Sequence, residues 1–123
     1  MIFNDPKPIY LQIADKIMDD IVAGSYGADS RLPSVREYAA SVEVNANTVM
    51  RTYDFLQQRG MIYNKRGIGY FVATDAGVRV LDERRRVFFA GEADYFFGRL
   101  HSFDVSPERL SEMYSEYLKT KSL

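Results

Sequence analysis

The stretch from residue 32 to residue 72 restricts the fold of this chain most, because it contains two short helical segments joined by a tight link. Ser34 and Glu37 form a capping box, in which each side chain accepts a hydrogen bond from the backbone N–H of the other residue. After the link 42–44, Asn45 is a natural N-cap for a second helix. Two short helices connected in this way predict a helix-turn-helix.

The residues after these helices predict an antiparallel hairpin. β-Branched and aromatic residues are concentrated in segments 61–64 and 70–73, which favours two strands. The turn between them is basic, and its glycines let the backbone come close to another surface: Lys65, Arg66, Gly67 and Gly69. A helix-turn-helix followed by such a hairpin is a winged helix. The predicted fold class is therefore mostly α with a small β-hairpin wing.

An amphipathic helix is expected before this unit, from Pro8 to about residue 23. Pro8 suits its first turn, and Gly24 and Gly27 end it. Isoleucines recur every fourth residue and so lie on one face: Ile9, Ile13, Ile17 and Ile21. Residues 1–74 are therefore expected to form one winged helix-turn-helix DNA-binding domain.

The remaining segment, residues 75–123, is expected to form a helical dimerisation tail. One helix is predicted from Asp75 to about residue 97, with weak points at Gly91 and Gly98, and another from residue 107 to residue 119. A helical stripe follows the first of these helices: Val78, Leu81, Arg85, Phe88 and Phe89. Two helices cannot bury all the aromatic side chains of the tail, which predicts a two-fold homodimer interface: Phe88, Phe89, Tyr95, Phe96, Phe97, Phe103, Tyr114 and Tyr117.

Composition and charge exclude several classes of protein. The chain of 123 residues contains no Cys, so it can form neither a disulfide framework nor a thiolate metal site. The first residues lack the features of a signal peptide, and no apolar stretch is long enough to span a bilayer, so a cytoplasmic protein is expected. The net charge of −1 is low for a DNA-binding protein, but every charge between residues 55 and 74 is basic.

No enzyme is predicted. The single histidine, His101, has no plausible Ser or Cys context for nucleophilic catalysis and no organised carboxylates near it, so we expect a structural role rather than a metal site. Gly67 and Gly69 lack the rest of a dinucleotide-binding fingerprint, and no cofactor is expected. The basic run 84–86 follows two acids and points in several directions on a helix, so it is expected to form a salt-bridged dimer surface.

Several of these motifs, in the same order and spacing, resemble the winged-helix domain of the GntR family of bacterial transcription regulators. They are Leu-Pro-Ser-Val-Arg at 32–36, Asn-Ala-Asn-Thr-Val-Met-Arg at 45–51 and Arg-Gly-Ile-Gly-Tyr-Phe-Val at 66–72, and the opening 8–13 is similar as well. The resemblance covers roughly residues 5–74. The Asn-x-Asn-Thr-Val-x-Arg variant and the short tail look most like the YtrA subfamily, whose tail dimerises. The resemblance implies a homodimeric, sequence-specific regulator on an inverted-repeat operator in double-stranded DNA. A repressor is expected, because a dimer on a promoter blocks polymerase by steric exclusion, although the sequence does not decide between repressor and activator.

The resemblance also implies which residues contact DNA. Arg36 matches the family's contacting Arg on the second helix and is expected to hold phosphate, whereas Arg51 in the recognition helix is expected to read guanine. Many members carry basic residues where this chain has Ala46 and Met50, so base readout is expected to depend on the neighbouring asparagines as well as on Arg51. The basic wing residues are expected to track the backbone or reach the minor groove. The full predicted set is Arg36, Asn45, Asn47, Thr48, Arg51, Lys65, Arg66, Gly67 and Gly69.

Two further interpretations stay open at this point. The winged helix could serve as a protein-interaction module whose aromatic tail docks a different protein, and the near-neutral charge and Met50 leave room for this alternative. A small-molecule effector could also occupy a cleft between the tail and the winged helix, although no set of residues identifies one.

Overall fold

The structure, a computed structural model, describes residues 7–122 of the chain. The chain divides into two compact units between Arg85 and Arg86. This division falls later than the domain boundary expected after residue 74, because Ala76 and Val80 of the following helix are buried in the core of the first unit. None of the helices in the described residues is long and apolar enough to cross a membrane.

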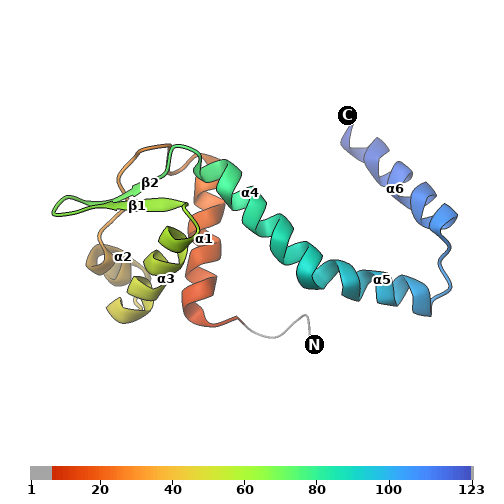
Figure 1. Ribbon diagram of the computed structural model, residues 1–123, viewed down its shortest axis with the longest axis horizontal. Helices are drawn as coiled ribbons and strands as arrows, with labels where there is room; N and C mark the ends of the chain where they lie inside the picture. The colour runs from red at the N-terminus through yellow and green to blue at the C-terminus, as the bar shows by residue number, and fades with distance from the viewer. Residues whose placement is uncertain (1–6, 123) are drawn as a thin grey trace. The chain divides into compact units, whose positions relative to one another are not determined.

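The first unit is a winged helix, as predicted (Figure 1). Its elements follow one another as α1 (Ile9–Ala23), α2 (Val35–Val42), α3 (Ala46–Gln58), β1 (Ile62–Lys65), β2 (Gly69–Val72) and the start of α4 (Ala76–Val87). The two strands are antiparallel, and Ile62 pairs with Val72 and Lys65 with Gly69. β1 begins one residue later than predicted, and the N–H of Met61 instead bonds to the carbonyl of Leu56 at the end of α3. β2 begins one residue earlier than predicted, at Gly69, which pairs with Lys65.

Local signals account for the boundaries of the three helices. The Ser34 Oγ accepts from the Glu37 N–H at 3.1 Å, and the Glu37 Oε1 accepts from the Ser34 N–H at 2.9 Å, which is the predicted capping box. Asn45 caps α3 by accepting from the Asn47 N–H at 2.7 Å. Gly24 closes α1 with a φ of 83°, in the left-handed region that glycine adopts at low cost.

The capping box makes a prediction for stability. We expect Ser34→Ala to lower the free energy of unfolding by about 1 kcal/mol at neutral pH, because the first turn of α2 loses its cap. Hydrogen bonds from the backbone and side chain of Ser34 lower the pKa of Glu37 below its ordinary value of 4.5. A carboxylate with a lowered folded-state pKa stabilises the fold above its unfolded-state pKa, and this contribution is lost as pH falls through the folded-state pKa. Urea unfolding at several pH values measures both effects, with Ser25→Ala, an exposed serine outside the helices, as the control.

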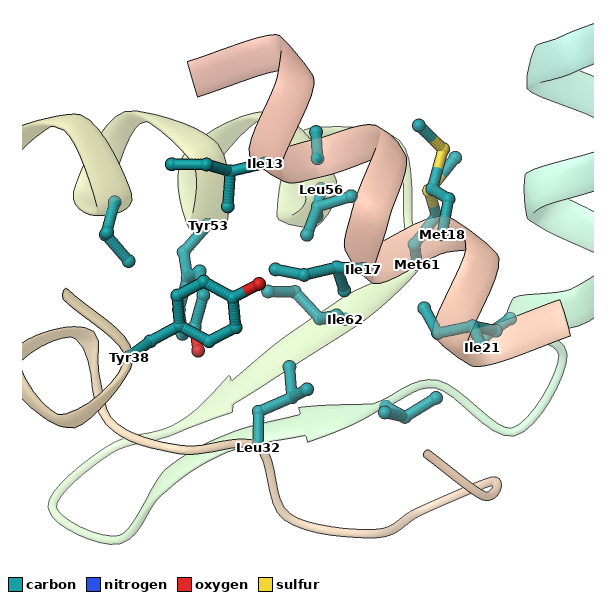
Figure 2. Packing of buried hydrophobic residues seen from close by; sticks show 14 of the residues in the cluster. Ile13, Ile17, Met18, Ile21, Leu32, Tyr38, Tyr53, Leu56, Met61 and Ile62 are labelled. Carbon is teal, nitrogen blue, oxygen red and sulfur yellow. The ribbon is translucent and has the colours of Figure 1, made fainter. Parts of the chain in front are cut away.

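Side chains from all three helices and from the hairpin form one core (Figure 2). The predicted stripe of α1 contributes Ile13, Ile17 and Ile21, whereas Ile9 at the start of the helix stays 55% exposed. From α3, Val49, Thr52, Tyr53 and Leu56 are buried completely. The Tyr53 hydroxyl donates to the Pro33 carbonyl at 2.7 Å, and burial raises the pKa of this hydroxyl. The buried face therefore sets which side of α3 points to solvent.

Ion pairs hold α4 against the helices before it. Arg84 lies 2.6 Å from the Asp19 carboxylate of α1, and Arg59 lies 3.3 Å from the Glu83 carboxylate of α4. The expectation that the run 84–86 is salt-bridged holds for Arg84, whose charge is paired within its own unit; its place in a dimer surface stays a prediction. This pairing joins segments 65 residues apart, which spacing along one helix could not predict.

The second unit is helical and differs in detail from the prediction. A π-helical turn, η1 (Phe88–Glu92), interrupts the expected single helix, and α5 (Ala93–Ser102) and α6 (Pro107–Lys121) follow. The predicted weak point Gly91 lies inside this turn, whereas Gly98 lies within α5 without a break. Ser106 caps α6 by accepting from the Arg109 N–H at 3.0 Å, and the helix starts at Pro107 as predicted. The solitary His101 is exposed in the last turn of α5.

The stripe predicted for the first tail helix does not pack into the core. Val78 and Leu81 of α4 are exposed, and Phe88 and Phe89 of η1 are exposed as well. The buried positions of α4 are instead Ala76 and Val80, which lie on the other side of the helix.

Candidate DNA-binding surface

A groove forms where α2, α3 and the hairpin meet. It places the predicted phosphate contact Arg36 of α2 beside the predicted wing residue Gly69. It also contains Met50 of α3, which sequence reasoning did not include among the DNA contacts. The complete lining is Arg31, Leu32, Ser34, Val35, Arg36, Met50, Ile68, Gly69 and Tyr70. Residues far apart in the sequence thus share one exposed surface.

The outward face of α3 extends this surface. Asn47, Met50, Arg51 and Asp54 are exposed on it, and Thr48 is half-buried near the start of the helix. This division into a buried and an exposed face agrees with the prediction. The Asn45 side chain is only partly available, because its Oδ1 already accepts from the Asn47 backbone. Its amide NH₂ remains the group that can donate to a nucleic acid.

The Arg51 guanidinium lies over an aromatic ring from another helix. Its Cζ is 4.1 Å from the centroid of the Tyr10 ring on α1. The Tyr10 ring meets Phe55 edge-on at 6.4 Å, and the Tyr10 carbonyl accepts from the Thr52 hydroxyl at 2.7 Å. Such stacking restrains a guanidinium while its N–H groups stay available for hydrogen bonds. Tyr10 is thus a residue of the site that sequence reasoning missed, and its place in the motif 8–13 was the only signal for it.

The tip of the wing needs its glycines. Gly67 and Gly69 have φ values of 79° and 143°, which side chains with a Cβ rarely adopt. A Cβ on Gly69 would also lie 3.0 Å from the Arg31 Nε, so the Arg31 side chain would have to move by a few tenths of an ångström. Lys65 and Arg66 are exposed beside this turn, and the Lys65 Nζ lies 4.8 Å from the Phe71 ring.

Of the predicted residues, the groove brings together Arg36 and Gly69. Asn45 caps α3, Asn47, Thr48 and Arg51 lie on α3, and the basic and glycine residues come from the wing. Among the described residues, no group of three or more His, Asp or Glu side chains is arranged to hold a metal ion.

Known proteins resemble this chain over most of its length. The uncharacterized HTH-type transcriptional regulator YhcF of Bacillus subtilis is 34% identical over 110 residues, which cover 89% of each chain. The HTH-type transcriptional repressor YtrA of the same organism is 30% identical over 119 residues, which cover 94% of this chain and 91% of YtrA. Both alignments extend beyond the winged helix into the tail.

A solved structure and a family model agree with these relatives. The crystal structure of a GntR-family transcriptional regulator from Bacteroides thetaiotaomicron superposes with a TM-score of 0.82 at 46% identity, and covers 93% of this chain and 99% of that one. The model of the bacterial regulatory proteins of the gntR family matches residues 9–72, from α1 to the end of the wing. The chain therefore belongs to the GntR family and is a DNA-binding transcription regulator rather than an enzyme.

Proposed function

We propose that the protein is a homodimeric repressor that acts in the cytoplasm on an inverted-repeat operator. The observation that carries this proposal is the groove in which Arg36, Met50 and the wing tip lie together beside the polar face of α3. A recognition helix of this kind enters the major groove by its N-terminal half, and two of them reach successive major grooves about 34 Å apart. A dimer bound to a promoter would exclude polymerase and so repress transcription. The similarity to the transcriptional repressor YtrA supports repression rather than activation.

Within this proposal the predicted contacts divide by their chemistry. Arg51 has a restrained guanidinium that suits bidentate contact with guanine, and Arg36 in the groove suits a phosphate. Asn47 and Thr48 lie at the N-terminal end of α3 and can donate to bases or phosphates. The remaining proposed contacts are the Asn45 amide and the wing residues Lys65, Arg66, Gly67 and Gly69.

The exposed apolar surface of the second unit supports the homodimer. Aromatic and aliphatic side chains of α5 and α6 line an apolar groove: Phe96, Phe97, Pro107, Leu110, Met113 and Tyr114. Phe97 is 53% exposed and Tyr114 is 61% exposed. Burial of apolar surface is the main driving force of association, and a two-fold dimer covers the same surface on both copies.

Selection of bound duplexes from a random DNA pool tests the proposed function. We expect the wild type to enrich an inverted repeat, and Arg51→Ala to lose the preference at one position in each half-site, where discrimination is worth roughly 1–3 kcal/mol. Arg36→Ala should weaken binding to all sequences alike and make it less dependent on salt, because it removes a phosphate contact.

The exposed residue Arg109 of α6 supplies the control, since Arg109→Ala removes one positive charge outside the proposed surface. An unchanged base preference in Arg51→Ala would refute the assignment of Arg51. Absence of any enriched sequence, together with binding that does not depend on salt, would refute the proposed function and favour a protein-interaction module.

A further inference from the structure

Met50 is an exposed apolar side chain on the polar outward face of α3. It is 41% exposed, and it lies in the groove between Arg36 of α2 and Ile68 of the wing. Its neighbours on the exposed face of the same helix are polar or charged: Asn47, Arg51 and Asp54. An exposed methionine at the centre of a polar recognition face suggests a ligand group that favours apolar contact.

The Met50 side chain is also anchored from one side. The Tyr70 hydroxyl donates to the Met50 Sδ at 3.9 Å. The Tyr70 ring meets the buried Tyr53 edge-on, with ring centroids 4.9 Å apart. This chain of contacts connects Met50 to the core and limits the directions in which the thioether can extend.

The chemistry of the major groove restricts what Met50 can recognise. A thioether donates no hydrogen bond and is only a weak acceptor, so it cannot read the donors and acceptors of the base edges as Arg or Asn does. The C5-methyl group of thymine is the apolar group that the four bases present in this groove. A flexible and polarisable methionine side chain can pack closely against such a methyl group.

We propose that Met50 reads the C5-methyl group of one thymine in each half-site of the operator. Tyr70 is a positioning residue in this assignment, because it contacts Met50 and not the base. The assignment rests on the proposed function, since it requires α3 to lie in the major groove. It adds a hydrophobic element of specificity to the polar contacts described above.

Replacement of thymine by deoxyuridine tests this assignment directly, because it removes the methyl group and leaves base pairing intact. Each thymine of the selected operator is replaced in turn, at symmetric positions in both half-sites, and Kd is measured at one salt concentration. For the wild type we expect one position where the replacement weakens binding by about fourfold per half-site, the effect of losing one buried carbon group. The other positions should show little change.

Three variants make the test specific. Met50→Ala should bind thymine and deoxyuridine operators equally at that position, whereas Met50→Leu should retain most of the discrimination because it keeps an apolar side chain. Tyr70→Phe removes only the contact with the sulfur, and it should reduce the discrimination without abolishing binding. If Met50 has only a structural role, Met50→Ala should weaken binding to the thymine and deoxyuridine operators by the same factor.

The outcomes separate this assignment from the proposed function. Equal discrimination between thymine and deoxyuridine in the wild type and in Met50→Ala would overturn the assignment and leave the DNA-binding dimer unaffected. Failure of the wild type to enrich any operator would refute the proposed function, and the assignment of Met50 with it.

Discussion

The double substitution Phe97→Glu and Tyr114→Glu is expected to convert the proposed dimer to a monomer. Both side chains line the apolar groove of the second unit and are more than half exposed in the single chain. A carboxylate buried in an apolar interface loses its hydration without a compensating partner, which is strongly unfavourable. Affinity for the operator should fall by about 100-fold or more, because a monomer cannot bind both half-sites at once.

Sedimentation equilibrium and operator titration of the same samples measure the two expected effects. Ser115→Glu is the matched control, because Ser115 is the exposed neighbour of Tyr114 and lies on the polar side of α6. This control variant should stay dimeric and bind as the wild type does. If the double variant remains a dimer with full operator affinity, then the tail groove is not the interface.

The substitution Ile17→Ala should have the largest effect on folding. Ile17 is fully buried on α1, and Figure 2 shows it among the side chains contributed by the other elements. Removal of its distal carbons leaves a cavity and reduces the buried apolar surface. Such substitutions in well-packed cores lower the free energy of unfolding by about 2–5 kcal/mol. We therefore expect the midpoint of urea unfolding to fall sharply without a change in the slope of the transition.

Ile9→Ala supplies the comparison for this measurement, since it makes the same chemical change on the same helix. Ile9 is 55% exposed, so its replacement should change the free energy of unfolding by less than about 0.5 kcal/mol. Both variants must be compared at one protomer concentration, because the proposed dimerisation would make the apparent stability concentration-dependent. Similar losses for Ile9 and Ile17 would contradict the burial pattern of α1.

Sequence reasoning succeeded where the determining interactions are local. The capping box joins Ser34 and Glu37 within one helical turn, and the Asn45 cap joins residues two apart. The order of the elements of the winged helix was predictable for the same reason. Periodicity separated the buried Val49 and Tyr53 from the exposed Arg51 on α3. The family resemblance then identified the residues to examine as DNA contacts.

Sequence reasoning was less informative where the structure depends on contacts between segments that are far apart in the sequence. Periodicity did not identify Ala76 and Val80 as the residues of α4 that pack into the core of the first unit. The helical pattern of the tail did not predict the π-helical turn at residues 88–92, although Gly91 indicated a weak point of the helix in this region.

The amino-acid sequence by itself determined the helices, their caps, the glycine-rich wing and the division of α3 into two faces, because hydrogen bonds and side-chain periodicity within a few residues specify them. Only the tertiary structure decided the surroundings of the functional side chains. It placed Tyr10 of α1 under Arg51 and the Tyr70 hydroxyl against Met50. Such contacts depend on the relative rotation and spacing of packed elements, which the shared core sets and which no local pattern encodes.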